Sequence, residues 1–155
     1  MSGAVEILVD ADACPVKEEV YRVALRLQVP VTLVANQYLR TPPTPLIRCQ
    51  MVSDGFDAAD DWIADHAGPK TVVVTADILL AERCIAAGAS VLSPTGKPFT
   101  ENSIGTTVAT RAIMADLRAG VGGEGIGGPA PFRKEDRSRF LSALDTMLHR
   151  VLRQA

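Results

Sequence analysis

Short apolar runs alternate along the first 92 residues with segments in which apolar side chains recur every three or four positions. The short runs, which predict β-strands, are residues 5–10, 31–35, 47–52, 71–75 and 90–92. The segments of helical spacing, which predict α-helices, are residues 15–28, 56–67 and 78–87. Strands that alternate with helices indicate a parallel sheet covered by helices on both faces. We therefore predict a three-layer α/β sandwich with a central, mostly parallel sheet of about four or five strands.

After residue 92 the pattern changes to turn residues, glycines and two further helical stretches. Residues 93–98 have the Ser, Pro and Gly content of a turn, and residues 103–119 predict a helix. Six of the nine residues at 120–128 are glycine, which predicts a mobile lid or tether. An apolar stripe at residues 134–154 predicts a final helix. We expect one domain over residues 1–155, with a core of about 1–92 and a helical C-terminal extension of about 93–155.

The composition is that of an ordinary globular protein. At 155 residues the chain has the size of a single domain, and its 47% hydrophobic and 22% charged residues exclude intrinsic disorder. No apolar run approaches the ~20 residues of a membrane span, and the first residues lack the basic start of a signal peptide. The cysteines at 14, 49 and 84 are too widely spaced for a disulfide framework or a CxxC metal site. These features predict a reduced, cytoplasmic compartment and no membrane contact.

Basic charge is concentrated near the C-terminus. Residues 133–155 carry 6 basic and 3 acidic side chains, whereas residues 1–132 carry 10 basic and 15 acidic ones. A candidate nucleic-acid-binding set consists of Arg111, Arg133, Lys134 and Arg137. The alternative is a solvated helix start, but basic residues are electrostatically disfavoured at a helix N-terminus, and this mismatch favours a binding role.

Carboxylates are expected to gather at one edge of the sheet. Asp10 ends the first predicted strand, and Asp77 follows the fourth. The second predicted helix carries Asp57, Asp60 and Asp61 in its first turns. Sites in open parallel sheets form beyond the carboxyl ends of the strands, where helix N-termini also point. Right-handed crossovers would place all these acids at that edge.

Clustered carboxylates repel one another unless a cation lies among them. Mg²⁺ and Mn²⁺ prefer oxygen ligands, and few carboxylates are needed when substrate phosphate oxygens complete the shell. Such ions generate a hydroxide nucleophile and stabilise the leaving oxygen of a phosphodiester. Structural roles are the alternative, since Asp57 and Asp77 could cap helices. Asp60 falls on the apolar face of its helix, where a buried acid needs a partner.

Three stretches carry distinctive motifs, namely residues 9–17 (VDADACPVK), 53–63 (SDGFDAADDWI) and 74–81 (VTADILLA). A fourth lies at residues 127–132 (GGPAPF) and continues through Asp136, Arg137 and Phe140. Together they resemble the YaiI/YqxD family of bacterial proteins, also known as domain of unknown function 188. The resemblance covers nearly the whole chain. It implies kinship with a family that is named without an established activity.

The acids at residues 60–63 (DDWI) and 74–77 (VTAD) are also similar, more distantly, to those of PIN-like nuclease domains. In those folds a first-strand Asp, a helix Asp and an Asp after a central strand gather one or two Mg²⁺ or Mn²⁺ ions. The resemblance therefore implies a PIN-like fold, catalytic and metal-binding roles for Asp10, Asp60 and Asp77, and RNA as the substrate. The acids that would complete the metal shell or orient water are Asp12, Asp57 and Asp61.

Three other interpretations stay open. Ser93 stands near the position where PIN domains usually show a later acid, so the chain could be a non-catalytic metal- or RNA-binding module with a degenerate site. Asp10 and Asp12 after an apolar strand also fit the nucleophile and the acid/base of a haloacid-dehalogenase-like phosphatase. Cys14 lies just before a helix N-terminus, where a thiolate would be stabilised, although a structural cysteine is the commoner outcome.

Overall fold

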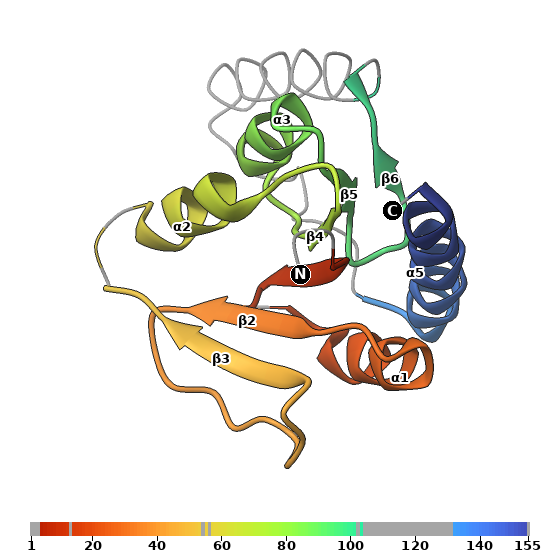
Figure 1. Cartoon of the computed structure of the whole chain (residues 1–155), viewed down its shortest axis with the longest axis horizontal. Helices are drawn as coiled ribbons and strands as arrows, with labels where there is room; N and C mark the ends of the chain where they lie inside the picture. Colours follow the sequence, from red (N-terminus) through yellow and green to blue (C-terminus); the bar gives the residue numbers. More distant parts are fainter. Residues whose placement is uncertain are drawn as a thin grey trace, which may run out of the picture.

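The computed structural model describes residues 4–12, 14–53, 55, 57–101, 103 and 132–154. Within them a central sheet has helices on both sides (Figure 1). The strands are β1 (Glu6–Asp10), β2 (Val31–Ala35), β3 (Ile47–Met51), β4 (Thr71–Val74), β5 (Ser90–Leu92) and β6 (Pro98–Phe99). The helices are α1 (Lys17–Leu27), α2 (Ala58–His66), α3 (Ile78–Ala86) and α5 (Lys134–Gln154).

The strands form one six-stranded sheet in the order β3-β2-β1-β4-β5-β6. All neighbouring strands are parallel except β5 and β6. The chain moves outward from β1 through β2 and β3 and then returns to the other side of β1 as β4. In an open parallel sheet, a crevice forms beyond the carboxyl ends of the strands at the point where the strand order reverses. In this sheet that point lies between β1 and β4.

Alternate residues of the central strands face two different helical layers. Ile7 and Val9 of β1 belong to one core with residues of α1 and α5, whereas Leu8 belongs to the core beneath α2 and α3 (Figure 1). Every residue of β2 and β4 is buried, as expected for strands that are covered on both faces. The predicted three-layer α/β sandwich with a mostly parallel sheet and a C-terminal helix is therefore confirmed.

The apolar stripe of α5 explains why the C-terminal helix packs against the sheet. Phe140, Leu144 and Leu148 are each 0% exposed and share the core with α1 and β1. The start of α5 also contacts the turn between β5 and β6. An added Cβ atom at Gly96, where φ is +86°, would lie 2.7 Å from the carbonyl carbon of Arg139. Only glycine combines this backbone conformation with so close an approach.

Most predicted boundaries agree closely with the structure. The bounds of β2, β5 and α5 are those expected from the sequence, and the other predicted elements are shorter by one or two residues at their ends. The sheet has six strands because β6, with only two residues, continues the segment predicted as a turn. The helix predicted at 103–119, apart from residue 103, and the glycine segment at 120–128 lie outside the described residues. No helix in the described part of the chain has both the length and the hydropathy needed to span a membrane.

Candidate active site

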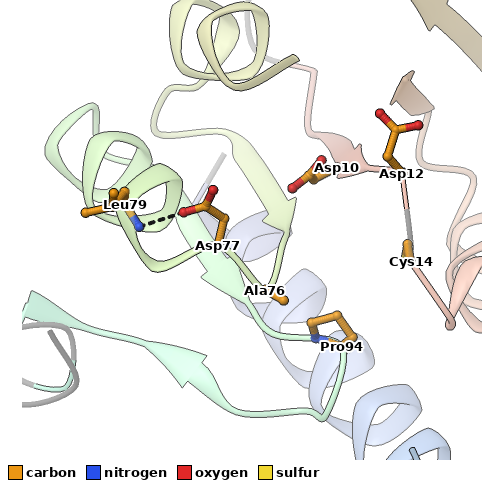
Figure 2. Close-up of a pocket in the computed structure, with 7 residues that line it drawn as sticks. All are labelled: Asp10, Asp12, Cys14, Ala76, Asp77, Leu79 and Pro94. Carbon is orange, nitrogen blue, oxygen red and sulfur yellow. Dashed lines mark hydrogen bonds between the residues drawn. The ribbon is translucent and has the colours of Figure 1, made fainter. Parts of the chain in front are cut away.

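A cavity of about 440 Å³ opens at the switch point of the sheet. Its lining residues are Asp10, Asp12, Cys14, Ala76, Asp77, Leu79 and Pro94. Figure 2 shows Asp10 and Asp12 on the side of β1, Asp77 in the segment that leads into α3, and Pro94 in the loop after β5. The structure thus brings together three of the acids singled out from the sequence.

The register between β1 and β4 determines which residues meet at the edge of the sheet. Val9 pairs with Val74, so the next residues along each strand, Asp10 and Thr75, become neighbours. The Thr75 hydroxyl donates a hydrogen bond of 2.9 Å to Oδ2 of Asp10. The same hydroxyl oxygen accepts a 3.0 Å hydrogen bond from the backbone N–H of Asp77. Thr75, which is 1% exposed, therefore links the two acids that end β1 and begin α3.

Asp77 is the N-cap residue of α3. Its Oδ1 atom accepts hydrogen bonds from the backbone N–H groups of Leu79, at 2.9 Å, and Leu80, at 3.2 Å (Figure 2 draws the first). These bonds satisfy two of the N–H groups that every helix start leaves without a partner. The capping role expected as the structural alternative is therefore present, but it uses one carboxylate oxygen and leaves the side chain at the cavity.

The environment of Asp10 disfavours its negative charge. Burial raises the pKa of the Asp10 carboxyl, and the charges of Asp77 and Asp12 raise it further, whereas the hydrogen bond from Thr75 lowers it. Like charges held together in this way are stabilised by a cation placed among them. Asp12 is held separately, because its Oδ2 accepts a 3.2 Å hydrogen bond from the backbone N–H of Asn36 after β2.

Asp60 does not line the cavity, but it lies close enough for the charges of the cavity acids to affect its pKa. Burial, together with the charges of Asp77, Asp10 and Asp57, raises its pKa to about 6, while Arg83 lowers it. The acid therefore has the unfavourable environment that its position on the apolar face of α2 predicts. Among the described residues, no side chain donates a hydrogen bond to it.

Asp57 and Asp61 are exposed acids at the start of α2. Asp57 is the residue before α2, in a left-handed conformation (φ 66°), and its side chain makes no capping hydrogen bond. Asp61 points to α3, where its Oδ1 accepts a 3.0 Å hydrogen bond from Nη1 of Arg83. Its side chain is 61% exposed, so this is a surface ion pair. Neither acid lines the cavity.

The basic residues at the start of α5 divide into two groups. Arg137 is engaged by the protein itself, because its Nη1 donates to the carbonyl oxygen of Pro15, at 2.6 Å, and to Glu19, at 3.4 Å. Its guanidinium also lies 4.9 Å from the centre of the Phe132 ring. Arg133 and Lys134 are exposed, and no side-chain ion pair of theirs is formed with the described residues. Arg111 lies outside the described residues.

The donor set of the cavity suits a hard divalent cation. Asp10 Oδ1 and Asp77 Oδ2 accept no hydrogen bond from the described residues, so each carboxylate keeps one oxygen for a ligand. In the same part of the chain, no three His, Cys, Asp or Glu side chains are arranged to hold a metal ion. Mg²⁺ requires less than this, because one or two carboxylates with water and phosphate oxygens are sufficient. The residues fit such an ion when substrate oxygens complete its shell.

Cys14 lines the cavity but lacks the character of a reactive thiol. Burial, the largest effect, raises the pKa of Cys14 above its usual range, while Lys17 and a backbone hydrogen bond at Val16 lower it. The side chain is only 8% exposed. The expected stabilisation of a thiolate by the nearby helix start is therefore outweighed by burial.

Sequence reasoning assigned no structural role to Thr75, Pro94 or Leu79. The spacing Thr-x-Asp after a strand signals a local hydrogen bond between the hydroxyl and the backbone, and this signal could have identified Thr75. Leu79 stands out as a leucine off the buried stripe of its helix, with 66% exposure. Nothing in the local sequence places Pro94 in the cavity, because that depends on how the loop after β5 packs.

Comparison with known proteins identifies relatives that match nearly the whole chain. A UPF0178 protein of Sphingopyxis alaskensis is 67% identical over 147 residues, which cover 95% of each chain. A UPF0178 protein of Jannaschia sp. is 61% identical over 145 residues, covering 94% of this chain and 93% of the relative. The UPF0178 protein bll3966 of Bradyrhizobium diazoefficiens is 59% identical over 148 residues, covering 96% and 87%. No solved structure matches the chain.

The family comparison agrees with the motifs. Residues 8–150 match the family described as "Uncharacterized BCR, YaiI/YqxD family". The match includes both cavity acids that end β1 and precede α3, and it extends almost to the end of α5. The chain therefore belongs to the YaiI/YqxD family.

Proposed function

We propose that the protein is a Mg²⁺- or Mn²⁺-dependent phosphodiesterase that acts on RNA, with its reaction centre at Asp10 and Asp77. The observation that carries the proposal is the convergence of these two acids from separate strands on one cavity at the switch point of the sheet. Each keeps a carboxylate oxygen for a ligand, and burial together with the nearby acids makes the charge of Asp10 unfavourable without a cation. The likeness of the acids to those of PIN-like domains supports the same reaction class.

The roles of the chain's residues follow from their contacts. Asp10 and Asp77 would hold the ion, and a bound ion would supply a hydroxide nucleophile at neutral pH and stabilise the charge of the leaving oxygen. Thr75 orients the Asp10 carboxylate through its hydroxyl and accepts a hydrogen bond from the backbone N–H of Asp77. Asp12 lines the same cavity and would orient water, while Asp60 adds negative potential from α2. Asp57 and Asp61 do not line this cavity and have no part in the proposed reaction.

RNA is proposed from the likeness to PIN-like domains, and basic residues of α5 support a nucleic-acid substrate. Arg137 and Arg139 of α5 donate hydrogen bonds to the carbonyl oxygens of Pro15 and Thr95, which adjoin the cavity residues Cys14 and Pro94. Arg133 and Lys134 stand one turn earlier, at the start of the same helix, and are exposed. Cations in this position would neutralise phosphates on either side of the scissile bond. Arg111 remains a predicted member of this set.

The proposal is tested by incubating the protein with end-labelled single-stranded RNA in Mg²⁺, in Mn²⁺ and in EDTA. We expect cleavage only with the ions, loss of cleavage in Asp77→Asn, and normal cleavage in Asp61→Asn, which is the matched control. Equal cleavage by Asp77→Asn and the unmodified protein would assign the activity to a contaminant and refute the proposal.

A non-catalytic RNA-binding module is the second candidate, favoured by the finding that no three potential metal ligands group together among the described residues. Such a module would bind RNA in EDTA, and alanine at Asp10 and Asp77 would leave binding intact or tighten it because repulsion of phosphates is removed. A phosphatase that uses Asp10 as nucleophile would instead yield a trapped aspartyl-phosphate.

A further inference from the structure

Arg137 and Arg26 both connect α1 with α5, but at opposite ends of α1. Arg26, in the last turn of α1, pairs with Asp145 of α5. Arg137, near the start of α5, reaches the segment that precedes α1 by donating to the carbonyl oxygen of Pro15 and to Glu19. Neither Arg26 nor Asp145 lines the cavity, whereas Pro15 directly follows the cavity residue Cys14.

The contacts of Arg137 hold its guanidinium in one position. One nitrogen serves two acceptors, at 2.6 Å and 3.4 Å, and the Phe132 ring lies 4.9 Å from the guanidinium carbon. A planar guanidinium can stack on a ring while it donates to oxygens in its plane, and lysine cannot reproduce this combination. The carbonyl of Pro15 is thereby fixed relative to α5.

The opposite wall of the cavity is attached to the same part of α5. Arg139 donates a hydrogen bond of 3.4 Å to the carbonyl oxygen of Thr95, the residue after the cavity residue Pro94. Gly96 packs directly on the backbone of Arg139 and Phe140. The first turns of α5 therefore support both walls, one through Arg137 and the other through Arg139 and Gly96.

We infer that Arg137 is a positioning residue of the cavity: by tying Pro15 to the start of α5, it fixes the wall that carries Cys14 relative to the carboxylates. The inference rests on the proposed function for its effect on cleavage, but its structural part is independent of any activity. It assigns Arg137 a structural role beside the expected phosphate contact, because one guanidinium nitrogen is already bonded within the protein.

The cysteines provide a built-in probe of this wall. Cys14 is 8% exposed at the cavity, Cys84 is 0% exposed in the core beneath α3, and Cys49 is partly exposed on β3. The alkylation rate of each cysteine in the full-length native protein is measured by mass spectrometry in the unmodified protein, Arg137→Met and Arg26→Met. Methionine retains a long, helix-compatible side chain, and Arg26→Met removes an equivalent α1–α5 tie away from the cavity.

We expect Arg137→Met to raise the alkylation rate of Cys14 by about tenfold, with Cys84 still protected, and Arg26→Met to leave Cys14 within about twofold of its original rate. Arg137→Lys should lie between them. Unchanged Cys14 reactivity in Arg137→Met would overturn the inference, and so would an equal rise in both variants. A rise at Cys84 as large as that at Cys14 would indicate general loosening and overturn it as well.

RNA cleavage separates this inference from the proposed function. A positioning residue predicts a lower kcat with little change in KM in Arg137→Met. A higher KM and a weaker salt dependence, with Cys14 unchanged, would show a phosphate contact and contradict the positioning role. If the unmodified protein cleaves no RNA, the proposed function fails, while the Cys14 measurement still decides the role of Arg137.

Discussion

The starts of α2 and α3 lie at the same edge of the sheet and both carry acids, yet they are built very differently. At α3 the carboxylate of Asp77 caps two backbone N–H groups, and the backbone N–H of Asp77 donates to the Thr75 hydroxyl. At α2 the preceding Asp57 adopts a left-handed conformation without capping, and the pKa of Asp60 is raised to about 6. At one start the acid satisfies backbone N–H groups while it lines the cavity, and at the other an acid has an unfavourable charge in the folded protein.

The difference shows that acids at the same edge of the sheet can have opposite effects on the stability of the fold. A capping aspartate needs no functional explanation, so the structural support for a site role of Asp77 is its place in the cavity with Asp10. An acid whose charge weakens the fold has no structural role that explains it, and Asp60 fits that description. The two helix starts can therefore be tested by substitutions that separate charge from structure.

The largest expected effect is at Asp77. Asp77→Asn keeps an oxygen that can cap α3 but removes the charge, so cleavage should fall by about 100-fold or more while the melting temperature is retained. Asp77→Ala should lose the same activity and also about 1 kcal/mol of unfolding free energy, because the cap is lost. Kinetics and thermal unfolding of both variants measure this. Activity retained in Asp77→Asn but lost in Asp77→Ala would mean that only the cap matters.

The next effect is at Thr75, which organises the α3 start. Thr75→Val preserves the side-chain shape but leaves the Asp77 N–H without its acceptor, so the unfolding free energy should fall by about 1–3 kcal/mol. The pKa of Asp10 should rise, since the lost hydrogen bond lowers it in the native protein. Denaturant unfolding and carboxyl NMR titration provide the two readouts. Thr75→Ser keeps the hydroxyl and should restore both, and an unaltered Asp10 pKa in Thr75→Val would exclude this role.

A smaller effect, of opposite sign, is expected at Asp60. Between the ordinary value of 3.8 and the folded pKa of about 6, the folded state holds a proton that the unfolded chain has released. Stability therefore falls as the pH rises through this window, and the deficit persists above it. Asp60→Asn removes the deficit.

In metal-free buffer at about pH 8, the melting temperature of Asp60→Asn should exceed that of the unmodified protein by roughly 2–4 °C, a range that allows for solvent screening of the charge. Near pH 4 the two melting temperatures should match. Scanning calorimetry at the two pH values measures the difference. An equal or lower melting temperature at the higher pH would show that the charge of Asp60 is already compensated.

The smallest effect is expected at Asp61, one residue further along α2. Its ion pair with Arg83 is exposed, and such pairs contribute about 0–1 kcal/mol. Asp61→Asn should change the unfolding free energy by no more than this and leave cleavage unaltered. A tenfold loss of cleavage would place Asp61 in the reaction centre and remove the contrast between the two helix starts.

The sequence predicted the fold and part of the site because the relevant signals are local. The alternation of apolar runs with helical spacing located β1 to β5 and α1 to α3, whereas the strand order is known only from the structure. The placement of Asp10 and Asp77 at one edge needs only the ends of two strands. The two-residue strand β6 is too short to show any periodicity.

The remaining site features depend on contacts between distant segments. The bond between Thr75 and Asp10 requires the register that pairs Val9 with Val74, and no single segment specifies it. The charge of Arg137 is visible in the sequence and predicts a phosphate contact, whereas its acceptor at Pro15 is a backbone carbonyl 122 residues away, which the sequence does not reveal. Side-chain exposure and non-local packing decide such roles.

The most direct test is a crystal of the protein soaked in Mn²⁺ with a non-hydrolysable RNA dinucleotide and examined by anomalous scattering. The account predicts an ion in direct contact with the carboxylates of Asp10 and Asp77 and with a phosphate oxygen, and no ion in the Asp77→Asn crystal. An ion bound elsewhere, or a dinucleotide seated in the cavity without any ion between its phosphate and these carboxylates, would contradict it.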